Sequence, residues 1–174
     1  MELRHGRGDL MGAAAIDTGK VFSEADVEIS EAVDFAEYYP FTAQAFDNME
    51  NIEAKPEGVG LVISPWNFPI AIPCGGILSM LAAGNTVIFK PASDSGLVAY
   101  ELCKCIWKAG VSKKVLQFIP CSGASVGPTL TKHPSVNSVI LTGSTETGME
   151  MLSTRLDIQL AAETGGKNAT IVSK

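Results

Sequence analysis

Apolar residues near the N-terminus recur at the spacing of an α-helix. Four of them occupy positions i, i+3, i+4 and i+7: Ile29, Ala32, Val33 and Ala36. This pattern predicts a helix with one apolar stripe that packs against the rest of the protein. Ser23 and Asp26 form an S-x-x-D sequence just before the stripe, so Ser23 is the expected N-cap. Pro40 is expected to end the helix, and residues 41–49 to be helical or irregular.

From Gly58 onward, short runs rich in β-forming residues alternate with longer segments of helical character. The runs span residues 59–64, 86–90, 115–120, 138–142, 158–162 and 169–173. Three segments bounded by Gly or Pro can form helices between the first four runs: residues 69–83, 95–109 and 125–133. This alternation predicts an α/β fold with helices on both faces of a mostly parallel sheet. Residues 1–56 are expected to form an N-terminal helical arm that precedes an α/β domain of residues 57–174.

Residues 58–89 carry no formal charge over 32 consecutive positions, a length that could span a membrane. The run nevertheless contains polar and helix-breaking residues: Pro65, Asn67, Pro69, Pro73, Gly75 and Gly76. A lipid-facing helix must satisfy its own backbone hydrogen bonds. We therefore expect a buried strand, an ordered loop and a buried helix, with no transmembrane segment.

Charge is distributed unevenly along the 174 residues. The chain has 13 Lys and Arg against 19 Asp and Glu, so it lacks the basic surplus of a nucleic-acid-binding protein. Residues 1–57 hold 13 acidic and 4 basic side chains, whereas residues 58–174 have a balance of +3. The second part is thus suited to a small anionic ligand. No secretory leader pattern opens the chain, which predicts a cytoplasmic protein.

The cysteines and histidines do not form a metal-site pattern. Cys103 and Cys105 fall in one predicted helix, where residues i and i+2 point to nearly opposite sides. The remaining candidates stand alone in the sequence: Cys74, Cys121, His5 and His133. Four reduced thiols that serve as small apolar residues are therefore expected, and no metal.

Polar or glycine-containing turns directly follow several of the predicted strands. They are Ser64–Asn67, Lys90–Pro91, Pro120–Gly123 and Thr142–Ser144. Ligands of parallel α/β sheets bind beyond the carboxyl ends of the strands, so these turns are expected to share a ligand-binding edge. The segment Gly143–Gly148 opens a helix and can face a phosphate with backbone N–H groups. It matches neither a P-loop nor G-x-G-x-x-G, and taken alone it favours a structural turn.

Three side chains at this edge have both a structural and a functional interpretation. Lys90 can extend into water, or it can bond a ligand hydroxyl or phosphate. Glu163 can be a solvated strand end or a general base beside the flexible pair Gly165–Gly166. Asn67 can find partners within its apolar loop or help to form an oxyanion site.

The order and spacing of these motifs resemble those of the aldehyde dehydrogenase superfamily over about residues 20–174. The resemblance rests on Ser64–Pro69 (SPWNFP), Lys90–Ala92 (KPA), Gly123–Gly127 (GxxxG), Thr142–Gly148 (TGSTETG) and Glu163–Lys167 (ETGGK). Residues 28–39, 81–85 and 109–120 are most similar to the Δ1-pyrroline-5-carboxylate dehydrogenase branch, including the dehydrogenase half of bifunctional proline-utilisation proteins. Enzymes of that branch oxidise glutamate γ-semialdehyde to glutamate with NAD. The resemblance implies a Rossmann-like sheet within an incomplete aldehyde dehydrogenase fold.

The resemblance also implies roles for individual residues. Asn67 would stabilise the oxyanion of the thiohemiacetal, and Glu163 would activate the water that hydrolyses the thioester. Lys90 would bond the adenosine ribose. The cofactor-binding positions implied in this way are Ile63, Ser64, Pro65, Trp66, Lys90, Ser93, Gly123, Gly127, Thr142, Gly143, Ser144 and Gly165.

Two departures from the family pattern affect these expectations. NAD-preferring relatives often carry Glu three residues after the lysine, where this chain has Ser93, so NAD is expected and NADP is the alternative. The family's nucleophilic cysteine lies well beyond the glutamate, and none of the four cysteines matches it. The chain is therefore expected to be an N-terminal fragment that oxidises no aldehyde alone. The complete enzyme is expected to be a homo-oligomer that acts on a small aldehyde.

Two other functions remain open at this point. One is a different aldehyde dehydrogenase, such as a succinate-semialdehyde type. The other is a truncated module that binds a dinucleotide and performs no chemistry. Titration with NAD and NADP distinguishes a working cofactor cleft from a non-functional one.

Overall fold

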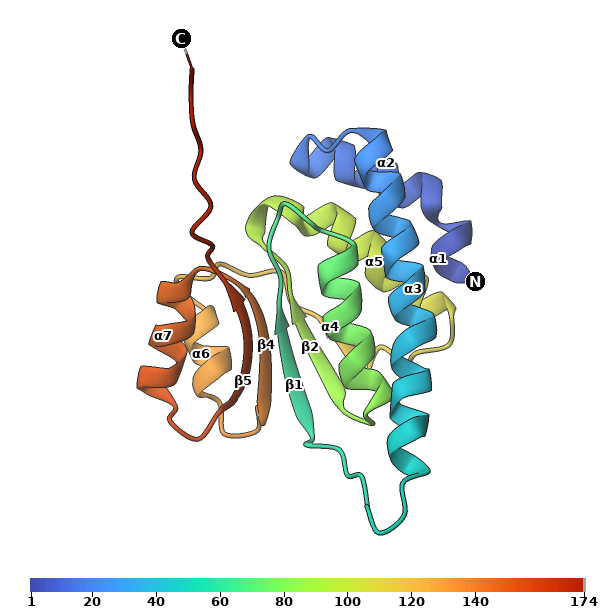
Figure 1. Ribbon diagram of the computed structural model, residues 1–174, viewed down its shortest axis with the longest axis vertical. Coiled ribbons are helices and arrows are strands. Elements are labelled where there is room, and N and C mark those ends of the chain that lie inside the picture. Colours follow the sequence, from blue (N-terminus) through green and yellow to red (C-terminus); the bar gives the residue numbers. More distant parts are fainter. Residues whose placement is uncertain (174) are drawn as a thin grey trace.

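A five-stranded parallel sheet forms the centre of the chain. The computed structural model describes residues 1–173, and the strand order is β3-β2-β1-β4-β5 (Figure 1). The strands are β1 (Val59–Ile63), β2 (Thr86–Lys90), β3 (Leu116–Phe118), β4 (Ser138–Gly143) and β5 (Gln159–Thr164). The helices are α1 (Glu2–His5), α2 (Arg7–Thr18), α3 (Phe22–Asp47), α4 (Ala71–Ala82), α5 (Gly96–Lys108), α6 (Gly127–Lys132) and α7 (Thr145–Thr154), with a 3-10 turn η1 (Ser93–Ser95). All four strand pairings are parallel, so the predicted α/β class is confirmed.

Helices cover both faces of this sheet. On one face lie α4 and α5, with α2 and α3 packed outside them, and on the other lie α6 and α7 (Figure 1). Side chains of a strand alternate between the faces. On β1, Val62 belongs to the core beneath α4 and α5, while Leu61 belongs to the core beneath α6 and α7. The central strands are apolar on both sides because both faces are covered.

The acidic N-terminal region packs onto the sheet layer through a shared core. Leu10 of α2 and Ile29 of α3 are fully buried in the same cluster as Ile77 of α4 and Leu102 of α5. Residues 1–19 lie in the predicted helical arm, but no individual helix was predicted for them, and they form α1 and α2. The division of the chain at residue 56 stays a prediction.

The long N-terminal helix differs from its prediction at both ends. It begins at Phe22 with Val21 as N-cap, so the prediction of Ser23 as N-cap is wrong. The Val21 carbonyl accepts hydrogen bonds from the Glu24 and Ala25 amides, which starts the helix before Ser23. Pro40 does not end the helix, which continues to Asp47. Because Pro40 lies on the exposed side, the carbonyl that it leaves without an amide partner can be hydrated.

The last predicted strand does not form among the described residues. Residues 169–173 contain no strand and extend away from the sheet beyond β5 (Figure 1). Ile171 is 92% exposed. A β-rich run forms a strand only where a neighbouring strand pairs with it. Within residues 1–173, β5 pairs with β4, and no strand pairs with residues 169–173. The other predicted strands and helices are confirmed, with ends that shift by a few residues.

Two adjacent glycines allow α4 to lie tightly between α3 and the sheet. A methyl group placed on Gly76 would come within 2.9 Å of the Val62 Cγ1 atom on β1. One placed on Gly75, on another side of the helix, would come within 3.2 Å of the Phe35 ring of α3. Since Val62 is buried and β-branched, it has little freedom to move aside. The Gly75–Gly76 pair therefore fixes the spacing of three layers.

We predict that Gly76→Ala destabilises the protein, because the added methyl group overlaps Val62. The expected loss is about 1–3 kcal/mol in the free energy of unfolding, measured with urea. Gly12→Ala is the matched control, since Gly12 lies within α2 and a methyl group there meets nothing within 4 Å. That control should stabilise the protein by about 0.5–1 kcal/mol. Equal stability of Gly76→Ala and the wild type would refute the tight packing of α4.

Three of the four cysteines are buried as small apolar residues, as predicted, whereas the fourth is partly accessible. Cys74, Cys103 and Cys105 belong to the core around α4 and α5, and Cys121 is half-buried. Burial raises the pKa of Cys103 to about 12 and also raises the pKa values of Cys74 and Cys105. Thiolates are the reactive form of cysteine, so these three side chains are unreactive in the folded protein.

Thiol labelling of the native protein near pH 8 should therefore modify Cys121 rapidly and the other three cysteines only after unfolding. Counting the modified groups with a disulfide reagent, before and after addition of denaturant, measures this difference. Cys121→Ser should abolish the rapid phase. Rapid labelling that persists in this variant would contradict the assigned burial.

Candidate functional site

A cleft opens at the point where the strand order of the sheet reverses. From β1, the chain continues through β2 and β3 on one side, whereas β4 and β5 lie on the other. Ligands of open α/β sheets bind beyond the carboxyl ends of the strands at such a switch point. A cleft of about 460 Å³ lies at this place, between the ends of β1 and β4 and against α6 and α7.

Ten of the twelve predicted cofactor positions line this cleft. They are Ile63, Ser64, Pro65, Trp66, Lys90, Gly123, Gly127, Thr142, Gly143 and Ser144. They come from the ends of β1, β2 and β4, from the loop after β3 and from the first residue of α6, all of which lie at one edge of the parallel sheet. Ser93 and Gly165 are exposed and do not line the cleft. The structure thus brings together most of the residues that were chosen from the sequence.

Lys90 is the buried cation of the cleft. The residue is only 5% exposed, although it ends β2 at the ligand edge. Its Nζ donates a hydrogen bond to the Pro91 carbonyl at 3.1 Å, and within residues 1–173 it has no carboxylate partner. A methyl group on Gly123 would come within 3.9 Å of this Nζ, so the glycine keeps the space beside the ammonium open. A buried ammonium with unused donors is well suited to bind ligand oxygens.

The first turn of α7 faces the same cleft. Ser144 is the N-cap, and its Oγ accepts a hydrogen bond from the Thr147 amide at 3.1 Å. Hydrogen bonds from its own backbone amide and from Ser144 hold the pKa of Glu146 below its usual range. The lowered pKa indicates that this helix start stabilises a negative charge, as the helix dipole favours, and the Glu146 side chain itself is exposed and does not line the cleft. The turn Gly143–Ser144 can therefore hold an anionic group.

The N-terminus of α4 is closed to an anion, although it follows β1 directly. The Glu28 carboxylate of α3 lies there, and its Oε1 accepts hydrogen bonds from the Ile70 and Ala71 amides at 2.7 and 3.0 Å. In dinucleotide-binding α/β folds, the helix after the first strand usually receives the diphosphate. Here Glu28 already supplies the negative charge, so a second anion would be repelled.

Sequence reasoning missed the helical wall of the cleft. This wall and its rim consist of Ala92, Pro128, Thr131, Leu141, Thr147, Glu150, Met151 and Thr154. The α7 members recur at positions i, i+3, i+4 and i+7, which is one face of the helix that Gly143–Gly148 opens. These four positions hold Thr, Glu, Met and Thr, so no shared residue type marks this face in the sequence, and which face turns toward the cleft depends on the packing of α7.

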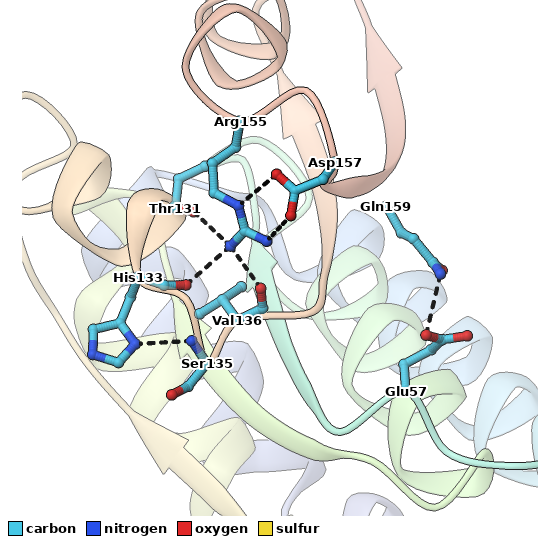
Figure 2. Close-up of polar contacts among 8 residues, drawn as sticks. All are labelled: Glu57, Thr131, His133, Ser135, Val136, Arg155, Asp157 and Gln159. Atoms are coloured by element: carbon cyan, nitrogen blue, oxygen red, sulfur yellow. Dashed lines mark hydrogen bonds and ion pairs between the residues drawn. The ribbon is translucent and has the colours of Figure 1, made fainter.

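Arg155 joins the two helices of this wall at their C-terminal ends. Its Nη1 donates hydrogen bonds to the carbonyls of His133 and Val136 at 3.0 and 2.8 Å, and reaches that of Thr131 at 3.5 Å (Figure 2). Its Nε and Nη2 bind the two carboxylate oxygens of Asp157. Through these bonds Arg155, which directly follows α7, holds the C-terminal end of α6 and the loop between α6 and β4. The spacing of α6 and α7 is fixed in this way.

The two predicted catalytic residues lie outside the lining of this cleft. Asn67 is exposed in the loop after β1, and its carbonyl accepts a hydrogen bond from Lys20 at 2.8 Å. Glu163 is exposed on β5, in register with Thr142 on β4. Paired residues of parallel strands point to the same face, so the Glu163 carboxylate and the Thr142 hydroxyl share a side of the sheet. No cysteine lines the cleft among the described residues.

Residues 1–173 contain neither a cluster suited to a metal ion nor a helix suited to span a membrane. No group of three or more His, Cys, Asp or Glu side chains is arranged to hold a metal ion. None of the described helices has both the length and the hydropathy needed to cross a membrane.

Comparison with known proteins agrees with the motifs and the fold. The family model for the aldehyde dehydrogenase family matches residues 1–174. Over 94% of the chain, the sequence is 44% identical to bifunctional protein PutA of Salmonella typhimurium. Over 91% of the chain, it is 38% identical to 1-pyrroline-5-carboxylate dehydrogenase of Geobacillus thermodenitrificans. The chain spans 13% of the length of the first relative and 34% of the second.

A solved structure gives the same result for the fold. The crystal structure of 1-pyrroline-5-carboxylate dehydrogenase from Thermus with bound NAD superposes with a TM-score of 0.88 and 33% identity. The match covers 95% of this chain and 36% of that one. With the whole chain matched by the family model and the parallel sheet shared with this enzyme, the chain belongs to the aldehyde dehydrogenase family.

Proposed function

We propose that this chain forms the dinucleotide-binding part of an NAD-dependent aldehyde dehydrogenase. The observation that carries the proposal is the cleft at the switch point, with the buried Lys90 ammonium in its wall. Its residues fit a nicotinamide dinucleotide, since they combine an apolar slot, a cation and a helix N-terminus. The bound dinucleotide would supply the hydride acceptor.

Each part of the cleft suits a different part of the dinucleotide. The slot between α6 and α7, with Pro128 and Met151, is apolar enough to hold a flat base. Lys90 is placed to donate hydrogen bonds to ribose hydroxyls. The turn Gly143–Ser144 would receive the diphosphate, because Glu28 occupies the alternative place at the start of α4.

The coenzyme we propose is NAD, with NADP as the alternative. Glu150 lines the cleft, and a carboxylate there disfavours the additional phosphate of NADP. The NAD in the Thermus structure supports the same choice. Ser93 occupies the position where NAD-preferring relatives often have Glu. It is exposed and uncharged, so it offers no positive charge to the additional phosphate of NADP.

For the substrate we propose glutamate γ-semialdehyde, which the resemblance to 1-pyrroline-5-carboxylate dehydrogenases supports. Asn67 would donate to the oxyanion, and Glu163 would activate the water. Their exposure leaves both side chains free for such roles. The covalent step needs a thiolate at the nicotinamide end of the cleft. Cys74, Cys103 and Cys105 are buried elsewhere, and Cys121 does not line the cleft, so we propose that these 174 residues bind the dinucleotide but do not oxidise an aldehyde by themselves.

Calorimetric titration of the chain with NAD should show binding in the millimolar range or tighter. Lys90→Met should weaken it about 10- to 100-fold, because a charge-assisted hydrogen bond is lost. Lys114→Met is the matched control, since Lys114 is exposed outside the cleft and its loss should leave the affinity unchanged. Absence of binding to the wild type, or equal affinity in Lys90→Met with an intact fold by circular dichroism, would count against the proposal.

Incubation of the chain with glutamate γ-semialdehyde and NAD should produce no reduced coenzyme, because no reactive thiol lines the cleft. The measurement is absorbance of NADH over time. A complete 1-pyrroline-5-carboxylate dehydrogenase in the same buffer serves as the positive control. Turnover by the 174 residues alone, above that of a heat-denatured sample, would overturn this part of the proposal.

A further inference from the structure

A buried ion pair lies beside the loop that follows β1. Lys20, in the link between α2 and α3, places its Nζ 3.0 Å from Glu28 Oε2. The two side chains are only 8% and 1% exposed. Glu28 Oε2 accepts no hydrogen bond with favourable geometry within residues 1–173, so the Lys20 charge is its compensation.

Both members of the pair contact the same loop. Glu28 Oε1 accepts the Ile70 and Ala71 amides at the end of the loop, where α4 begins. Lys20 Nζ donates to the Asn67 carbonyl at 2.8 Å and lies 4.1 Å from the centre of the Phe68 ring. Residues 67–71 are thus held at successive points by two side chains from the N-terminal helices.

Stability alone is a poor explanation for this arrangement. Removing two charges from water is costly, and a well-packed apolar pair often gives equal or greater stability. The charged groups instead provide positional specificity, because the ammonium and the carboxylate each form hydrogen bonds with particular backbone atoms. Those backbone atoms lie in the second half of the segment that connects β1 to α4. The first half of the same segment, Ser64 to Trp66, forms one wall of the cleft. An apolar pair could bury the loop but could not fix the position of the Asn67 carbonyl.

We infer that Lys20 and Glu28 are positioning residues. They hold the loop of residues 64–70, between β1 and α4, so that Trp66 lines the dinucleotide cleft while the Asn67 side chain stays exposed. The effect of the two residues on ligand binding in the cleft rests on the proposed dinucleotide binding. Their effect on the conformation of the loop does not, and it can be measured without any ligand.

The two tryptophans provide a test with an internal control. Fluorine NMR of the 5-fluorotryptophan-labelled chain gives one signal for Trp66 in the loop and one for Trp107 on α5. Lys20→Met should shift or broaden the Trp66 signal and leave that of Trp107 in place. Lys113→Met is the matched control, because Lys113 lies 4.8 Å from the centre of the Trp107 ring and should affect that signal alone. Lys20→Arg, which keeps the charge and the donors, should restore the wild-type Trp66 signal.

Lys20→Met leaves Glu28 without a counter-charge and can therefore fail to fold. The double variant Lys20→Met/Glu28→Gln removes both charges and keeps an oxygen for the Ile70 and Ala71 amides. It should fold, lack the Asn67 contact and still show the changed Trp66 signal. A wild-type Trp66 signal in the folded double variant would overturn the inference.

NAD titration of the same variants separates the two proposals. If the loop is correctly placed in only a tenth of the molecules, the apparent dissociation constant rises about tenfold. We expect a weakening of this size in the double variant and none in Lys113→Met. Failure of the wild type to bind NAD would refute the proposed function, while the fluorine signals would still decide the positioning role. Normal NAD affinity in a double variant with a changed Trp66 signal would refute the link between loop and cleft.

Discussion

Carboxylates of the N-terminal helices satisfy the first amide groups of the two helices that follow β1 and β2. Glu28 of α3 accepts the Ile70 and Ala71 amides at the start of α4, and Asp17 of α2 accepts two amides in the first turn of α5. Negative charge is favourable at both places because of the helix dipole. These bonds fix the N-terminal region to the carboxyl edge of the sheet. The cleft is instead lined by the starts of α6, at Gly127, and of α7, at Ser144.

The uneven charge of the chain follows from this arrangement. The acidic surplus of residues 1–57 includes the carboxylates that bind helix N-termini, so part of it has a structural task at the ligand edge. The cleft itself is built from residues 63–154 and contains Lys90 and one carboxylate, Glu150. Because Glu28 and Asp17 occupy two helix starts at this edge, the start of α7 at Gly143–Ser144 is the position that we propose for the diphosphate.

Much of the fold and of the cleft could be predicted from the sequence, for a physical reason. Alternating strands and helices place every strand end at one edge, so residues such as Ser64, Lys90 and Thr142 converge whatever the details of packing. The face that α7 turns toward the cleft depends on packing, so Met151 was not predicted. Lys20 and Glu28 were missed because their contacts with the loop join residues more than 40 positions apart. Pro40 misled the prediction of α3 because an exposed proline is tolerated there.

Binding of the dinucleotide in the cleft between β1 and β4, with its diphosphate at the start of α7, can be followed by two-dimensional amide NMR of the nitrogen-labelled chain during addition of NAD. The Gly143, Ser144 and Thr147 amide signals should shift until the site is saturated, while those of Ile70 and Ala71, which donate to Glu28, should not move. Shifts confined to the start of α4, or a spectrum unchanged at millimolar NAD, would contradict this mode of binding.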